Sequence, residues 1–277
     1  MDNASVETKA TTVFAYIQSA AASLTREGRI GNAKRHTALL NSLRRYRDNC
    51  DLTFHEMDEV MVKDYETWLL GNGLTRAASS AYLRNLRTLF YSAADEGIIS
   101  RRNIFSGVYT GFPKTERHAV DTESLDKIRD IDLSRHSSLA FARDLFFFSF
   151  YMKGISFVDM AHLRKSDLKD GYVVYVPEKS RTASRVRWER EMQDIVDRYA
   201  LKTRGLPYIL PIITRLDGTE RLQYESSMRS VNRNLNRIGR MLGLAFPLTT
   251  NVARNTWDAM ARDMNLPLEA LRHAAKV

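Results

Sequence analysis

Four stretches of helical periodicity in the first hundred residues constrain the fold more than any other feature. Apolar side chains recur every three or four residues within about 12–25, 32–48, 58–72 and 75–96, a spacing that places them on one face of a helix. Gly28, Gly31 and the Gly71-Asn-Gly73 turn interrupt the periodicity, and Thr75 can cap the fourth helix. Helices of this length with short joins predict a small bundle.

The periodicity stops after the fourth stretch. Residues 101–120 contain glycine, proline and several charges without helical spacing, which is typical of a linker between two modules. We therefore expect a first domain at 1–100, a linker at 101–120 and a second domain at 121–277.

The second domain is predicted to be helical with a small β-hairpin. Helices are expected at about 138–152, from 154 onward, at 192–201 and at 222–242, with a buried connector at 206–213. Tyr172–Val176 is β-branched and aromatic, residues 177–184 form a polar turn, and Arg185–Trp188 alternates as a returning strand. The fold class predicted for the whole chain is mainly α with one small sheet.

The charge balance indicates a polyanionic partner. The chain holds 42 Lys and Arg against 33 Asp and Glu, a net charge of +9 with a pI near 9.6, and most of the excess lies after residue 112. Nucleic acid is the first candidate partner and an anionic membrane the second. The helix at 222–242 has no acid between Ser226 and Leu242, and its arginines share one face suited to phosphates: Arg229, Arg233, Arg237 and Arg240. A solvated face is the alternative.

Several classes of site are excluded by composition. Cys50 is the only cysteine, so neither an intrachain disulfide nor a cysteine-based metal site can form. The six histidines show no ligand-like cluster, and we expect no metal and no cofactor. The N-terminus has no apolar signal core, and the apolar run at 145–152 is too short to span a bilayer. These features predict a cytoplasmic protein without a membrane partner.

The stretch from Phe246 to Ala261 places an arginine at the start of a helix. Pro247 and the Thr249-Thr250 pair supply turn and capping chemistry. Arg254 then falls in the first turn, where free backbone N–H groups already favour an anion. It is either an anion ligand or a surface arginine whose charged end reaches into solvent.

Two phrases of the second domain resemble the tyrosine recombinase (phage integrase) family, most closely integrases of conjugative elements of the Bacteroides type. They are Phe148-Ser-Phe-Tyr-Met-Lys-Gly-Ile-Ser-Phe-Val-Asp-Met-Ala-His-Leu-Arg-Lys-Ser-Asp-Leu168 and Leu248-Thr-Thr-Asn-Val-Ala-Arg-Asn-Thr-Trp257. The resemblance implies that the first four helices form a SAM-like core-binding domain. The second domain is then an integrase catalytic-type domain.

In that family a tyrosine attacks a DNA phosphodiester and forms a 3′-phosphotyrosine without metal or cofactor. Negative charge grows on the phosphorus centre, so two arginines and a histidine-like donor surround it. A lysine on a β-hairpin protonates the leaving oxygen.

The resemblance assigns these roles to particular residues here. Arg254 matches the second catalytic arginine, and Asn251 stands three residues earlier, where a hydrogen bond can be donated but no proton shuttled near neutral pH. Lys179 matches the hairpin lysine, with Arg181 as a rival in a shifted register.

The first catalytic arginine has no direct match. Counting back from Asp159, its position falls on Ser156. Relatives of the Bacteroides type resemble this pattern, with an arginine earlier in the turn, and that place is Lys153 here. Lysine keeps the charge but lacks the bidentate fork.

The family continues with a Gly-His pair and then the nucleophilic tyrosine. The last tyrosine of these 277 residues is Tyr224, upstream of Arg254, and His273 lies a few residues early for the Gly-His histidine. The catalytic set is therefore expected to be vestigial, without a terminal nucleophile segment.

The resemblance and the charge together predict double-stranded DNA and other recombinase protomers as partners. The expected DNA contacts are Lys34, Arg35, Arg84, Arg87, Arg229, Arg233 and Arg237. One interpretation is an integrase for a mobile element that cannot cleave DNA by itself. The alternatives are a catalytically inactive DNA-binding regulator derived from a recombinase, and a helical scaffold whose charge serves only solvation.

Overall fold

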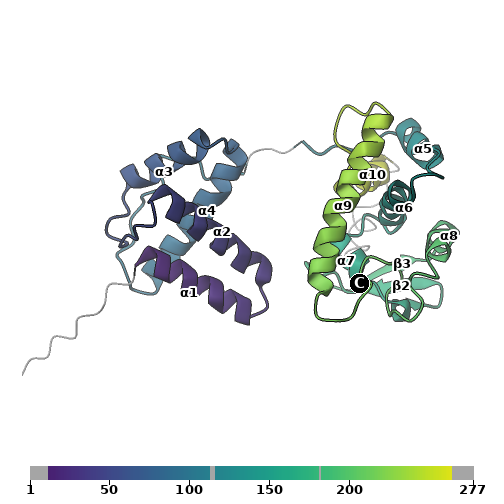
Figure 1. The fold of residues 1–277 in the computed structure, drawn as a ribbon, viewed down its shortest axis with the longest axis horizontal. Helices are drawn as coiled ribbons and strands as arrows, with labels where there is room; N and C mark the ends of the chain where they lie inside the picture. The colour runs from purple at the N-terminus through teal and green to yellow at the C-terminus, as the bar shows by residue number, and fades with distance from the viewer. Residues whose placement is uncertain (1–11, 113–115, 181, 264–277) are drawn as a thin grey trace, which may run out of the picture. The chain divides into compact units, whose positions relative to one another are not determined.

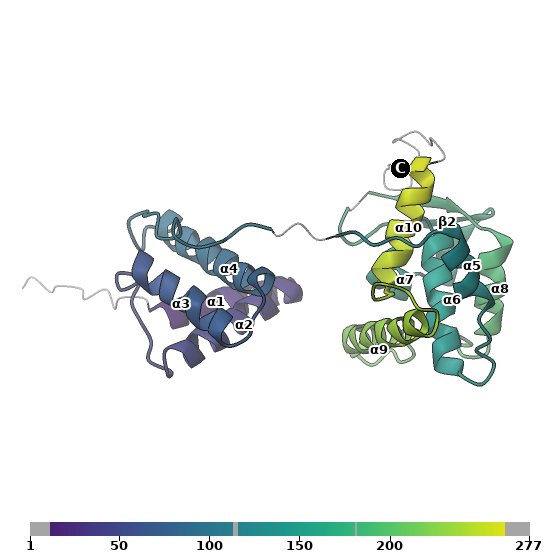
Figure 2. The ribbon, with the colours of Figure 1, turned by 90° about the horizontal axis from the view of Figure 1, so that it is seen from above.

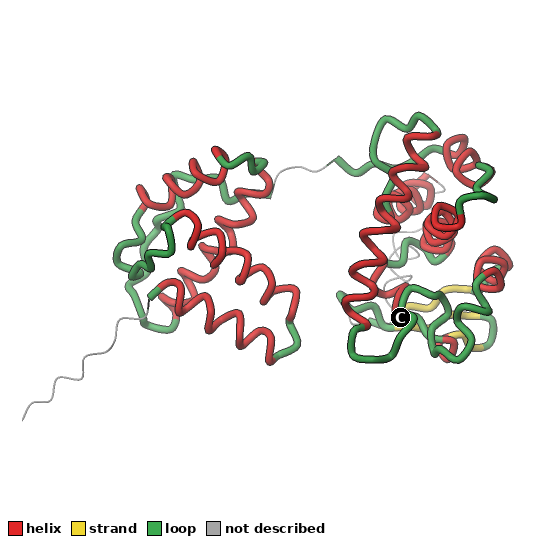
Figure 3. Tube along the Cα trace, in the orientation of Figure 1, coloured by secondary structure: helices red, strands yellow, loops and turns green. Residues whose placement is uncertain are grey.

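The computed structural model describes residues 12–112, 116–180 and 182–263 and divides the chain into two compact units, Met1–Thr115 and Glu116–Val277. Figure 3 shows that helices dominate both units and that strands occur only in the second. The predicted class, mainly α with one small sheet, is confirmed. Within the described residues, no helix is long and apolar enough to cross a bilayer.

The first unit is the predicted four-helix bundle (Figure 1). Its helices are α1 (Val13–Arg26), α2 (Ile30–Tyr46), α3 (Glu59–Gly71) and α4 (Arg76–Asp95). Thr12, Asp58 and Thr75 cap α1, α3 and α4 with side-chain oxygens that accept backbone N–H bonds, which satisfies donors that a helix start leaves unpaired. The stripes predicted from the sequence meet in one core, which includes Leu39, Leu43, Tyr65, Leu83 and Phe90.

The chain stays attached to this bundle after α4. Ile104 and Phe105 are 6% and 4% exposed and belong to the first core. Residues 109–112, which we call the strap, then lie along α4. Ser80 Oγ donates a 2.6 Å hydrogen bond to the Gly111 carbonyl, and Arg84 Nη1 donates to the same oxygen.

Stacking holds both ends of the strap. The guanidinium of Arg84 lies 3.9 Å from the ring centroid of Phe112, and that of Arg76 lies 4.4 Å from the ring of Tyr109. Arg87 Nη1 donates to Thr110 Oγ1 at 2.8 Å. On the other side of the expected linker, Val120 is buried in the second core.

Helix α6 (Ser137–Tyr151) forms the centre of the second unit. It packs against α8 (Arg190–Arg198), α9 (Glu220–Met241) and α10 (Thr250–Asp263), and Figure 2 shows it enclosed by these helices and α5 (Thr122–Asp130). The apolar run predicted as a buried helix supplies this core, with Leu145, Phe146 and Phe148 at 0% exposure. Tyr208, Ile209 and Ile213 confirm the buried connector between α8 and α9.

A three-stranded antiparallel sheet completes the second unit, in the order β1-β2-β3. The predicted hairpin is confirmed as β2 (Tyr172–Tyr175) and β3 (Ser184–Arg187), paired so that Val173 faces Val186. The sequence did not predict β1 (Leu168–Lys169), because two residues carry no alternation to recognise. The short α7 (Phe157–His162) and a 3-10 turn at Lys165–Asp167 connect α6 to the sheet.

A buried carboxylate joins α6 to α8. Asp144 is 4% exposed and accepts a 2.8 Å hydrogen bond from the Tyr199 hydroxyl. The guanidinium groups of Arg143 and Arg198 lie 3.2 and 3.0 Å from its two oxygens. Burial is the main cause that raises the pKa of the Tyr199 hydroxyl, and the Asp144 charge adds to it. Both oxygens of a buried anion are thus satisfied, as its desolvation requires.

We predict that Asp144→Asn destabilises the second unit by about 2 kcal/mol, because charge-assisted hydrogen bonds contribute about 1.5–3 kcal/mol each. Urea unfolding followed by circular dichroism measures the change. Asp194→Asn is the matched control, since Asp194 is exposed on α8 and should leave the transition unchanged. Equal effects of the two variants would contradict the role given to Asp144.

Candidate functional site

Arg254 lies in the second turn of α10 and not in the predicted first turn, because the helix begins at Thr250, and its side chain is exposed to solvent. Val252 and Ala253 are 4% and 0% exposed and fix the rotation of the helix against the core. Thr250 N–H donates to Asn232 Oδ1 at 3.0 Å, which ties the helix start to α9. Arg254 is exposed, and within the described residues its guanidinium has no ion pair or hydrogen bond. An exposed guanidinium without a protein partner can pair with an anion.

The turn after α6 lies directly against Arg254. Lys153 has φ 55° and Gly154 has φ 76°, and Gly154 N–H closes the helix end by donating to the Ser149 carbonyl at 2.8 Å. A Cβ on Gly154 would lie 2.8 Å from Arg254 Cγ and 3.1 Å from its Cα. Glycine is therefore required twice, for the left-handed backbone and for the space that the Arg254 stem fills.

Asp159 connects α7 to the loop between β2 and β3. Its Oδ2 accepts a hydrogen bond from Ser156 Oγ, the cap of α7, and its Oδ1 accepts the Glu178 backbone N–H at 2.9 Å. Lys179 follows Glu178 and is exposed. The carboxylate thus fixes the start of the loop that carries Lys179.

The charges of Asp159 and Arg254 both act on the Tyr175 phenol. Burial raises the pKa of Tyr175 to about 12; the Asp159 charge adds to the rise, while a hydrogen bond with Ser184 and the charge of Arg254 oppose it. The phenol is therefore protonated at neutral pH. Sequence reasoning missed this residue, because alternation placed it in a strand without indicating what its side chain would face.

The structure thus places Arg254 against the turn that carries Lys153, and it joins the base of the loop that carries Lys179 to Asp159. Ser156, at the position counted for the first arginine, serves as the cap of α7 instead. Asn251 is exposed at the start of α10. Arg181 and His273 lie outside the described residues.

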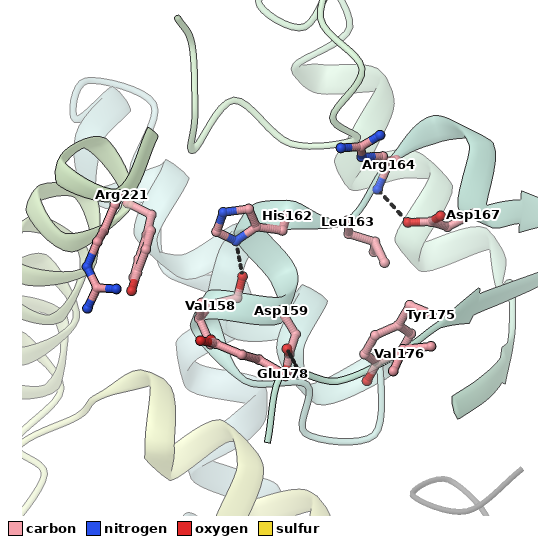
Figure 4. Close-up of a pocket in the computed structure, with 11 residues that line it drawn as sticks. Val158, Asp159, His162, Leu163, Arg164, Asp167, Tyr175, Val176, Glu178 and Arg221 are labelled. Atoms are coloured by element: carbon pink, nitrogen blue, oxygen red, sulfur yellow. Dashed lines mark hydrogen bonds between the residues drawn. The ribbon is translucent and has the colours of Figure 1, made fainter. Parts of the chain in front are cut away.

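An open pocket of about 450 Å³ adjoins this site (Figure 4). Asp159, Tyr175 and Glu178 line one side, and Arg221 and Tyr224 reach in from α9. His162 Nδ1 donates to the Val158 carbonyl at 2.9 Å, and its ring centroid lies 5.5 Å from that of Tyr224. In the part of the chain that the structure describes, no group of three His, Cys, Asp or Glu side chains could hold a metal ion.

The basic residues predicted as DNA contacts differ in their surroundings. On α9, Arg229, Arg233 and Arg237 are exposed, and none has an ion pair or hydrogen bond within the described residues. On α2, Lys34 and Arg35 are exposed, and Arg35 donates to Asn32. Arg84 and Arg87 hold the strap, so the fold already uses them within the first unit.

The first unit matches a known family model. Residues 12–106 correspond to the phage integrase SAM-like domain. No curated protein matches the chain in sequence.

Solved structures cover both units. A lambda integrase dimer bound to a COC′ core site matches with a TM-score of 0.66, 14% identity, and coverage of 95% of this chain and 90% of that chain. Over that span the chain has the fold of this integrase.

Other structures with this fold agree. The Tn1549 transposon integrase in complex with transposon right end DNA gives a TM-score of 0.66 at 13% identity, covering 94% of this chain and 90% of that one. The XerH site-specific recombinase bound to a difH substrate gives a TM-score of 0.65 at 14% identity. That match covers 93% of this chain and 77% of the XerH chain. The resemblance predicted from two sequence phrases is confirmed by the fold, and the expected SAM-like domain by the family model.

We predict that Gly154→Ala destabilises the second unit more than Gly171→Ala does. Both glycines have left-handed backbones, at φ 76° and 73°, but a Cβ on Gly171 would meet nothing within 4 Å. The left-handed backbone alone costs an alanine about 1–2 kcal/mol, and only Gly154→Ala must also displace Arg254. Urea unfolding of both variants measures the difference, and equal losses of stability would show that the Arg254 stem does not pack tightly there.

Proposed function

We propose that the chain binds duplex DNA as an integrase-type protein of site-specific recombination, with Arg254 as the ligand of the phosphate at which recombinases act. The observation that carries this proposal is the exposed, unpaired guanidinium of Arg254, whose stem packs against Gly154. The solved structures with the same fold are integrases and recombinases bound to DNA, as dimers and tetramers among others.

The site residues support particular parts of phosphoryl chemistry. Two parallel N–H groups of Arg254 can hold the non-bridging oxygens of a phosphate. Lys153 adds charge from the neighbouring turn, and Lys179 is the candidate proton donor on its loop. Asn251 can donate a hydrogen bond but cannot carry a proton.

Cleavage of DNA by these 277 residues is not part of the proposal. The Arg254 charge acts on Tyr175, but burial raises the pKa of its phenol to about 12, so the nucleophilic phenolate is less populated than in a free tyrosine. With Lys153 and Asn251 at two catalytic positions, the residues favour a second candidate equally well: a regulator or accessory factor that holds DNA without cutting it. A mobile element is the proposed setting for both.

We predict that neutralising α9 weakens DNA binding in a salt-dependent manner. Arg229→Gln, Arg233→Gln and Arg237→Gln together should lower the slope of log K against log salt by about 0.9 for each phosphate that the protein no longer neutralises. Fluorescence anisotropy with a labelled duplex measures the slope. A control with Lys127, Lys202 and Arg204 changed to Gln removes equal charge from other exposed positions. A salt-independent affinity of the parent protein would overturn the DNA proposal.

We predict that incubation with a nicked duplex, in which cleavage would be trapped, gives no covalent protein–DNA adduct on a denaturing gel. An adduct would contradict the non-cleaving proposal. In that event, Tyr175→Phe and Tyr224→Phe would identify the tyrosine, because only the variant that lacks the nucleophile should lose the adduct.

A further inference from the structure

The three-stranded sheet has one face that the core does not use. Side chains alternate between the two faces of a strand, and Val173, Val186 and Ser184 point into the unit with exposures of 0%, 2% and 0%. The opposite face carries Lys169, Tyr172, Val174, Arg185 and Arg187. Val174 on this face is 41% exposed, and its three basic residues are exposed.

The charges on this outer face have one sign. The three strands contain Lys169, Arg185 and Arg187 and no Asp or Glu. Asp170 and Glu189 lie just beyond the ends of the strands. Within the described residues, none of the three cations has an ion pair or a hydrogen bond to a carboxylate.

The register brings the three cations around a single aromatic ring. Tyr172 lies opposite Arg187 on one side and opposite Lys169 on the other, so these three residues form a row across strands about 4.8 Å apart. The guanidinium of Arg185 lies over the Tyr172 ring, 3.7 Å from its centroid. We call Lys169, Tyr172, Arg185 and Arg187 the outer sheet patch.

This arrangement costs stability in the isolated protein. Like charges that are close together on one sheet face repel each other, and solvent screens them only in part. A bound polyanion would turn the repulsion into attraction. Arg185 is already held over Tyr172, so its side chain gives up less entropy when its fork meets a phosphate.

The patch cannot contact the same phosphate as Arg254. Tyr175, which feels the Arg254 charge, shares the inner face of the sheet with Ser184, and the outer sheet patch points the opposite way. Any anion bound there belongs to another part of the DNA or to a second duplex.

We propose that the outer sheet patch is a second DNA-binding surface, which contacts the phosphate backbone of a duplex segment other than the one at Arg254. This inference rests on the proposed function, because DNA is the polyanion that the chain then holds close by. Guanidinium forks suit phosphate oxygens in particular, and the patch reads no base sequence.

The test compares two charge-matched double variants on a long duplex. Arg185→Gln with Arg187→Gln should lower the slope of log K against log salt by about 1.8, from about 0.9 per neutralised phosphate. Lys202→Gln with Arg204→Gln should leave the slope unchanged. Circular dichroism establishes that both variants are folded.

A second measurement does not depend on affinity. Acetylation of lysines, read by mass spectrometry, should slow several-fold at Lys169 when the parent protein is saturated with duplex. Lys202 should react at the same rate with and without DNA.

The outcomes separate this inference from the proposed function. If the triple α9 variant lowers the salt slope but the sheet variant does not, and Lys169 stays reactive, the second surface is wrong and the proposed function stands. If the parent shows no salt-dependent binding, both fail. In a third outcome, the Arg185→Gln, Arg187→Gln variant keeps the parent's slope of log K against log salt for DNA but loses binding to phosphatidylserine vesicles. In that case the patch binds a membrane surface and the DNA inference is overturned.

Discussion

The contact between the Arg254 stem and Gly154 is the constraint on which the second unit's site depends. The closed end of α6 needs a left-handed residue, and α10 needs space for the stem of Arg254; Gly154 satisfies both. Because α6 is the central helix of the unit, the arginine is held by the core itself. The packed stem restricts the side chain near the backbone, which lowers the entropy that its guanidinium loses on binding an anion.

Asp159 performs the corresponding task for the β2–β3 loop. One carboxylate oxygen accepts a hydrogen bond from the Ser156 hydroxyl, which caps α7, and the other accepts one from the Glu178 backbone N–H. Polar loops between strands are commonly mobile, and a backbone bond to a fixed helix reduces that mobility at the base of this one. The geometry around Arg254 thus comes from two short connections, the turn at Lys153–Gly154 and the loop base at Glu178, each held by a neighbouring helix.

The sequence predicted the elements better than the contacts among them. The spacing of apolar residues predicted all four helices of the first unit, and the alternation of side chains predicted the hairpin, because both patterns reflect which face is buried. It did not predict that Arg84 and Arg87 hold the strap, since an arginine on a polar helix face has the same pattern whether it meets solvent or its own chain. Tyr175 and the outer sheet patch were not predicted for a related reason. Arg254, whose charge acts on Tyr175, comes from α10, far away in sequence, and the residues of the patch become neighbours only through the strand register. The roles of Lys179 and Asn251 came from family resemblance and stay predictions.

The strap also extends the first unit beyond its four helices. Stacking and hydrogen bonds hold the chain to α4 through Phe112, and the second unit begins at Glu116. Residues 109–112, which the sequence assigns to a linker, therefore add contacts to the first unit. A fragment that ended at residue 100 would lose the side-chain contacts that Arg76, Arg84 and Arg87 make with the strap.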